Sequence, residues 1–91
     1  DGLLMSDDLC MHAMTGSFAG RASGVLDAGC DVAMHCSGDM AEMVDLAAGV
    51  RPMTPEAMQR LDSAMASVAG AGESASFEEL AAKRDSLLAY A

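Results

Sequence analysis

The chain has 91 residues, a net charge of −9 and a hydrophobic content of 52%. A chain of this length forms one small domain at most, and its acidic charge argues against binding to nucleic acids or anionic membranes, which require basic patches. No apolar run reaches the roughly 18–20 residues of a membrane-spanning helix. The three cysteines show no disulfide framework, so we expect a protein of the cytoplasm.

The first 50 residues alternate between strand and helix patterns. A short apolar run predicts a buried strand over Gly2–Ser6, although its periodicity alone does not distinguish it from a helix segment. A polar loop over Asp7–Ser17 follows it. Helical spacing of apolar residues predicts a helix over Phe18–Ala28, and Gly29 stands where a left-handed glycine would end that helix. Alternating residues predict a second strand over Cys30–Cys36.

Another helix is expected after the second strand. Asp39 is the predicted N-cap, and Glu42 three residues later completes a pattern similar to a capping box. The two strands begin about 28 residues apart, which is typical of one βαβ unit with parallel strands. Residues 1–50 are therefore expected to form two successive βα units, with helices covering the sheet.

Residues 51–91 are expected to form a helical extension of the same domain. Thr54 and Pro55 are the predicted N-cap and first residue of a helix that ends near Ala69. Ser76 and Glu79 form a capping box that opens the last helix. In each helix, apolar spacing predicts one face that packs in a core or against another helix. These faces comprise Met58, Leu61, Met65 and Val68, and then Phe77, Leu80, Ala81, Arg84, Leu87 and Leu88.

Two adjacent carboxylates, Asp7 and Asp8, follow the first predicted strand. The simplest interpretation is a pair of loop acids, one of which caps a turn. The functional interpretation is that one carboxylate projects from the strand end as a nucleophile or base, because catalytic groups must stay ionised on a rigid element. Asp7 directly follows the strand and is better placed than Asp8 for this role.

Three segments resemble one enzyme family. Residues 2–11 are similar to the strand-and-loop motif of family 3 glycoside hydrolases, specifically the bacterial β-N-acetylhexosaminidases of cell-wall recycling, which carry Ser-Asp-Asp-Leu-x-Met after an apolar strand. Residues 16–22 and 26–31 resemble further segments of these enzymes at the expected distances. The resemblance covers about residues 1 to 37, and the remaining residues are similar only in their helical character.

The resemblance implies an α/β fold that is the C-terminal part of a (β/α)8 TIM barrel, with two parallel strands and their helices followed by two C-terminal helices. It implies that Asp7 is the nucleophile and that Asp8 supports the loop by hydrogen bonds. The substrate would be a β-linked N-acetylglucosamine on peptidoglycan fragments, with no metal or organic cofactor. The acid/base of such enzymes is a His on a loop upstream, so the partner of this chain would be the rest of the barrel. We expect the 91 residues alone to be inactive.

A different hypothesis follows from the soft side chains around the two histidines, His12 and His35. Clustered thiol, thioether and imidazole groups suit Cu(I) or zinc, with Cys10, His35 and Cys36 as ligands. Their spacing does not match a common structural zinc pattern, so packing is the simpler interpretation. The alternative function is thus a small soft-metal-binding or helical interaction module without enzymatic activity. A half-barrel that self-associates through open sheet edges is a third hypothesis.

Overall fold

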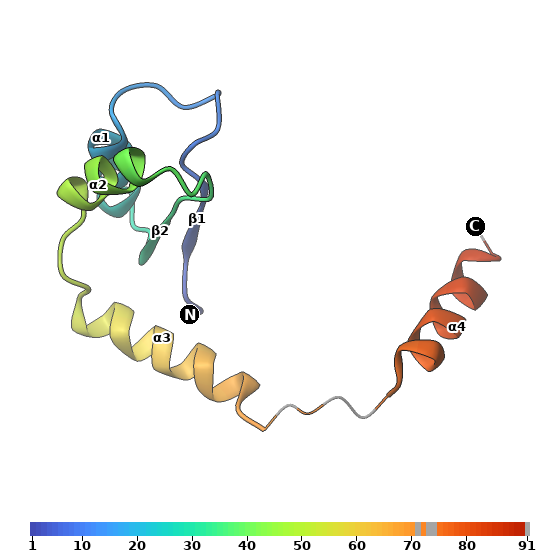
Figure 1. The fold of residues 1–91 in the computed structure, drawn as a ribbon. Helices are drawn as coiled ribbons and strands as arrows, with labels where there is room; N and C mark the ends of the chain where they lie inside the picture. Colours follow the sequence, from blue (N-terminus) through green and yellow to red (C-terminus); the bar gives the residue numbers. More distant parts are fainter. Residues whose placement is uncertain (71, 73–74, 91) are drawn as a thin grey trace.

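The computed structural model describes residues 1–70, 72 and 75–90. Within these residues the chain forms two strands and four helices (Figure 1). They are β1 (Met5–Asp8), α1 (Phe18–Asp27), β2 (Val32–Met34), α2 (Met40–Gly49), α3 (Pro55–Val68) and α4 (Phe77–Leu88). The two strands pair in parallel. The predicted α/β class, the parallel pairing and the order of the elements are thereby confirmed.

The first strand begins three residues later and ends two residues later than the predicted range Gly2–Ser6. Met5 lies opposite Val32 and Asp8 lies opposite Met34, so that three steps along β1 match two along β2. One extra residue in one strand is the definition of a β-bulge, which bends the strand and redirects its side chains. The expectation that both acids come after the strand is therefore wrong, because the pairing continues through them.

Two hydrogen bonds explain how the pairing continues past the bulge. The hydroxyl of Ser6 accepts the backbone N–H of Met34 at 2.9 Å. The backbone N–H of Leu9 then donates to the carbonyl of the same Met34, also at 2.9 Å. The Ser6 side chain thus takes the place of a backbone carbonyl as the hydrogen-bond acceptor. Leu9, the residue directly after β1, is buried.

Helix α1 packs against both β2 and α2. Its N-cap is Ser17, whose hydroxyl accepts the backbone N–H of Gly20 at 3.1 Å. The carboxylate of Asp45 on α2 accepts the backbone N–H groups of Phe18 at 2.9 Å and of Ala19 at 3.4 Å. A carboxylate at this position satisfies free N–H groups and interacts favourably with the helix dipole. Asp45 therefore joins α2 to the beginning of α1.

The end of α2 lies directly against the beginning of α1. A Cβ atom added to Gly49 would lie 2.0 Å from the carbonyl oxygen of Ala19 and 2.6 Å from its Cα atom. Because these are backbone atoms, no side-chain rotation could relieve the overlap. At the other end of α1, Gly29 has a φ of 108°, which confirms the predicted left-handed glycine.

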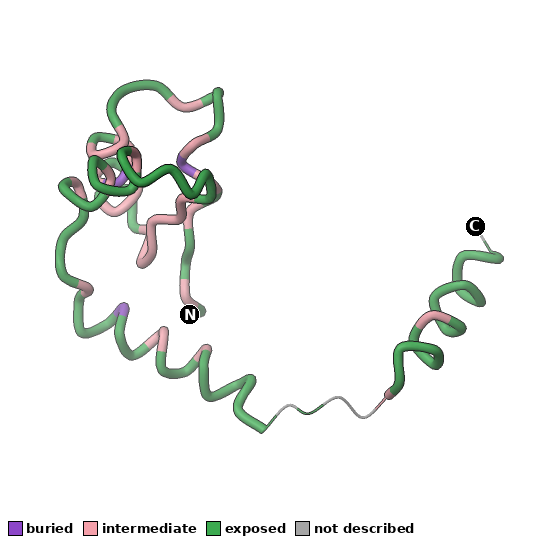
Figure 2. The backbone as a smooth tube through the Cα atoms, viewed as in Figure 1, coloured by how far each residue is buried: buried purple, intermediate pink, exposed green. Residues whose placement is uncertain are grey.

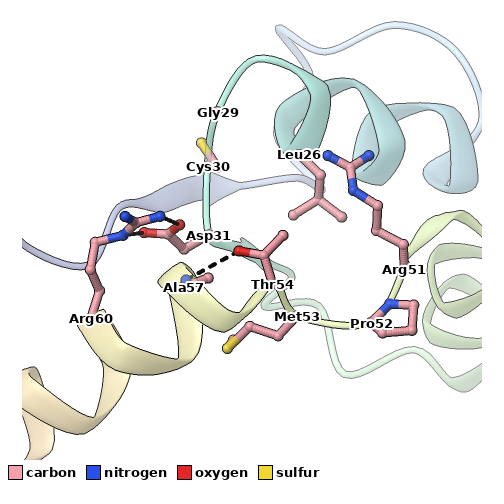
Figure 3. A pocket seen from close by; sticks show the side chains of 10 residues that line it. All are labelled: Leu26, Gly29, Cys30, Asp31, Arg51, Pro52, Met53, Thr54, Ala57 and Arg60. Carbon is pink, nitrogen blue, oxygen red and sulfur yellow. Dashed lines mark hydrogen bonds and ion pairs between the residues drawn. The ribbon is translucent and has the colours of Figure 1, made fainter.

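The first turns of α3 attach that helix to the βαβ unit. Thr54 caps the helix as predicted, since its hydroxyl accepts the backbone N–H of Ala57 at 3.1 Å. Ala57 is buried. The guanidinium of Arg60 binds both carboxylate oxygens of Asp31, at 2.6 and 2.9 Å (Figure 3). Asp31 also accepts the backbone N–H of Leu4, so one carboxylate joins both strands to α3.

The apolar faces predicted to be buried on the last two helices are mostly exposed, with only Leu61 and Ala81 half-buried (Figure 2). Met58 and Met65 of α3 are 54% and 60% exposed, and Phe77 of α4 is 77% exposed. The packing prediction is wrong for these residues because only the first turns of α3 meet the βαβ unit and α4 lies apart from it (Figure 1). The capping box of α4, between Ser76 and Glu79, is confirmed. None of the described helices combines the length and apolar character needed to span a membrane.

Candidate functional site

The side chains that could act as nucleophiles, acids, bases or metal ligands lie together at the carboxyl edge of the sheet. Asp7 and Asp8 are the last two residues of β1, and His35 and Cys36 directly follow β2. Because the strands are parallel, their carboxyl ends lie at the same edge. Ligands of open α/β sheets and barrels commonly bind at this edge, so it is the candidate site.

Asp8 is the centre of a hydrogen-bond network. Its Oδ1 atom accepts the backbone N–H groups of Cys10 and Cys36, both at 3.0 Å, and its Oδ2 atom accepts the thiol of Cys10 at 2.7 Å. The hydrogen bond from the Cys10 thiol, followed by that from its backbone N–H, holds the pKa of Asp8 below its ordinary value. The expectation that Asp8 supports the loop by hydrogen bonds is confirmed.

The two thiols at this edge are held in their protonated form. The hydrogen bond to the Asp8 carboxylate raises the pKa of the Cys10 thiol. Loss of hydration, and then the negative charge of Asp8, raises the pKa of the Cys36 thiol. Neither cysteine is therefore an activated thiolate nucleophile. Cys30 precedes β2 and lines a pocket at the opposite, amino edge.

Asp7 differs from Asp8 in how much of its carboxylate remains free. The side chain is exposed, and its Oδ1 atom accepts the backbone N–H of Asp8 at 2.8 Å. No described residue donates a hydrogen bond to its Oδ2 atom. Ser6 fixes the backbone by donating its hydroxyl to the carbonyl of Asp7 at 2.8 Å. Such a carboxylate, available on a fixed strand, can act as a nucleophile or a base.

His35 lies almost completely inside the protein, with 5% of its side chain exposed. Its Nε2 atom lies 3.0 Å from the carboxylate of Glu42 and 2.8 Å from the hydroxyl of Ser37. Its ring packs edge-on against Phe18, with centroids 5.1 Å apart. The buried Nδ1 atom has no hydrogen-bond partner among the described residues. Glu42 binds His35 and Ser37, so it does not complete the predicted capping box, although the N-cap itself is confirmed.

A ring nitrogen of His35, a carboxylate oxygen of Asp8 and the thiol of Cys10 all lie within 4.8 Å of one another. The metal hypothesis named Cys10, His35 and Cys36 as ligands. The structure brings the first two together but places Asp8, not Cys36, in the group. Sequence spacing did not indicate Asp8 as a member because its contact with His35 depends on the pairing of two distant strands.

Arg21 holds the loop that carries Cys10. Its guanidinium donates to the carbonyl groups of Leu9 at 2.7 Å, Met14 at 3.1 Å and Gly16 at 3.2 Å. No sequence motif around Arg21 indicates this role, because its three acceptors are backbone carbonyls. The planar, forked guanidinium can satisfy several carbonyls at once, so Arg21 determines the path of the loop. His12 lies on the same loop and is exposed, outside the group around Asp8.

A pocket of about 210 Å³ lies away from these residues, at the amino end of β2 (Figure 3). Two arginines, Arg51 and Arg60, line it, and each is paired with a carboxylate: Asp27 and Asp31 respectively. Because both cations are already neutralised, the pocket offers no free charge for an anionic ligand. It is a gap between α1 and α3 rather than part of the candidate site.

No known family model matches this chain, and no solved structure is similar to it. Any function of the chain must therefore be inferred from the residues at the carboxyl edge of the sheet.

Proposed function

We propose that the chain is the C-terminal part of a retaining β-N-acetylglucosaminidase with a (β/α)8 barrel, similar to family 3 glycoside hydrolases. In this proposal Asp7 is the nucleophile. The substrate is a β-linked N-acetylglucosamine at the non-reducing end of peptidoglycan fragments, and the enzyme acts in the cytoplasm without a metal or organic cofactor.

The observation that supports this proposal most directly is the contrast between the two acids. Asp8 uses both carboxylate oxygens to hold Cys10 and Cys36. Asp7 keeps one oxygen free of hydrogen bonds from the described residues and lies in the bulge at the carboxyl end of β1. A nucleophile of a retaining glycosidase must be fixed in position and accessible to the substrate. Of the two acids, Asp7 meets these requirements.

The proposed reaction has two steps. A carboxylate oxygen of Asp7 attacks the anomeric carbon while the glycosidic carbon–oxygen bond breaks and the leaving oxygen takes a proton from the acid. Water then attacks the same carbon, releases Asp7 and gives its proton to the base, so the anomeric configuration is retained. In the related family the acid/base is a His on an earlier barrel loop. The 91 residues are therefore expected to need the preceding part of the barrel for activity.

The exposed apolar surface supports the proposal that further barrel strands pack against this chain. Leu4 and Met5, at the first strand, are 53% and 49% exposed. A two-stranded sheet is marginally stable by itself, and unpaired strand edges favour association with further strands. In a complete barrel the neighbouring strands would pair with these edges.

The test uses the complete protein, including the barrel strands that the proposal requires upstream of Asp1. It is incubated with a 5-fluoro analogue of an activated N-acetylglucosaminide, which forms the covalent intermediate but hydrolyses it slowly. Digestion and mass spectrometry should then find the sugar on Asp7. Asp7→Ala should reduce hydrolysis of an aryl N-acetyl-β-glucosaminide by several orders of magnitude. Added azide should partly restore turnover and give the α-glycosyl azide.

The matched control is Asp8→Asn, which retains the size of the side chain and the neighbouring Asp7. In this variant the label should still be found on Asp7. A label on Asp8, near-normal turnover of Asp7→Ala, or the absence of any barrel strand encoded upstream of Asp1 would each contradict the proposal.

A further inference from the structure

Three potential metal ligands from separate parts of the chain meet at the carboxyl edge of the sheet. Asp8 ends β1, Cys10 lies in the loop that follows, and His35 follows β2. One ligand atom from each lies within 4.8 Å of the other two. Their meeting depends on the parallel pairing of β1 with β2, in which Asp8 lies opposite Met34, the residue before His35.

His35 has the surroundings of a metal-binding histidine. Imidazole ligands usually donate the ring N–H that does not bind the metal to a carboxylate, which fixes the orientation of the ring. Here Nε2 lies 3.0 Å from Glu42 and 2.8 Å from Ser37. Nδ1 is buried and has no partner among the described residues. A buried polar atom without a partner is costly and requires an explanation, and a bound cation would provide one.

We propose that Asp8, Cys10 and His35 bind one Zn²⁺ ion, with His35 binding through Nδ1. The inference is independent of the proposed hydrolase activity, because it uses Asp8 rather than Asp7. Carboxylate, thiolate and imidazole are all ordinary zinc ligands, and three protein ligands leave a fourth tetrahedral position for water.

The chemistry of the three ligands favours Zn²⁺ over Cu(I), Ca²⁺ and Mg²⁺. Cu(I) prefers soft sulfur ligands, whereas Ca²⁺ and Mg²⁺ prefer oxygen ligands. An ion of intermediate softness, such as Zn²⁺, suits a site with one oxygen, one sulfur and one nitrogen ligand. Tetrahedral zinc places its ligand atoms about 3.5 Å apart. The Cys10 Sγ and Asp8 Oδ2 atoms, now 2.7 Å apart, would therefore separate by about 1 Å as Zn²⁺ replaces the thiol proton, which passes to solvent.

The test uses the 91-residue chain, freed of metal by chelation, and Zn²⁺ or Co²⁺ alone as the probe. Zn²⁺ titration should show one site per chain that survives dialysis. Co²⁺ should give a thiolate charge-transfer band together with the intense visible absorption of tetrahedral coordination. Cys10→Ser should abolish the charge-transfer band. His35→Gln should weaken Zn²⁺ binding by more than tenfold. Glu42→Gln should weaken it by about 10- to 100-fold, because Glu42 contacts Nε2 of His35 and orients the ring.

Three matched controls lie outside the proposed site. Cys30→Ser, Cys36→Ser and His12→Gln change residues of the same types and should leave Zn²⁺ affinity and the Co²⁺ spectrum unchanged. Circular dichroism of each variant should show that it retains the helices. Loss of the charge-transfer band in Cys36→Ser rather than Cys10→Ser would overturn the proposed ligands. A wild-type Co²⁺ spectrum without that band, or no Zn²⁺ retained by the wild-type chain, would overturn the site without depending on any variant.

Discussion

The carboxylate of Asp8 accepts the backbone N–H of Cys36 at 3.0 Å, although the two residues are 28 positions apart. This hydrogen bond connects the end of β1 to the residues that follow β2. The same carboxylate also holds the backbone N–H of Cys10 in the loop after β1. Asp8 therefore maintains the arrangement of the carboxyl edge, while the neighbouring Asp7 remains available to a ligand.

The first prediction concerns the different contributions of these two acids to stability. Asp8→Ala should lower the urea concentration at which half of the protein is unfolded, because it leaves the backbone N–H groups of Cys10 and Cys36 without their acceptor. Asp7→Ala removes one local hydrogen bond at an exposed site and should have a much smaller effect. Urea unfolding followed by circular dichroism measures both. Equal midpoints for the two variants would contradict the structural role of Asp8.

The close contact between α1 and α2 gives a second prediction. Gly49→Ala should lower the free energy of unfolding by about 1–3 kcal/mol, as is typical of overpacking, because its Cβ would lie 2.0 Å from the carbonyl oxygen of Ala19. The control is Gly24→Ala in α1, where an added Cβ meets no atom within 4 Å. This variant should gain about 0.5–1 kcal/mol from its better helix propensity. Destabilisation by both substitutions, or by neither, would show that the helices pack differently.

The third prediction tests how Arg21 holds the loop after β1. Arg21→Lys should lower the free energy of unfolding by about 1–3 kcal/mol, because one ammonium cannot reach the three carbonyls that the guanidinium contacts. Hydrogen exchange of residues 10–16 should become faster. Arg84→Lys is the control, since Arg84 pairs with the adjacent Asp85 on the surface, and should change stability by less than about 0.5 kcal/mol. Unchanged exchange in Arg21→Lys would contradict this role.

The fourth prediction concerns pH. Hydrogen bonds from Arg60, and then from the backbone of Leu4, lower the pKa of Asp31 to about 2. The pKa of an Asp side chain in the unfolded protein is about 3.9. The folded state therefore favours the ionised carboxylate. This stabilisation is fully present above about pH 5 and is lost as pH falls through about 4 towards 2.

Comparison of the wild type with Asp31→Asn isolates this contribution. The variant should be less stable than the wild type at neutral pH, and the difference between their urea midpoints should shrink as pH falls from about 5 to 2. A difference that stays constant over this range would show that the ion pair with Arg60 does not form. Other carboxylates titrate in both proteins, so their contribution cancels in the comparison.

The local structure could be predicted from sequence because its hydrogen bonds join residues that are close in the chain. Thr54 and Ser76 cap their helices by accepting N–H groups three residues later. Gly29 adopts the positive φ that ends α1. The apolar stripes of the later helices could also be predicted, but whether other residues cover them could not, and Met58 and Phe77 remain more than half exposed.

The order of strands and helices, the N-caps of the last three helices and the glycine that ends α1 could be predicted from residue types alone. Each depends on residue types and spacings within a few positions. Only the tertiary structure decided that β1 contains a bulge, that Asp8 rather than Asp7 holds Cys36, and that Asp8, Cys10 and His35 meet. Each of these relationships involves residues of β1 and β2 or their ends that are more than 20 positions apart, and it exists only when the parallel strands pair in one particular register.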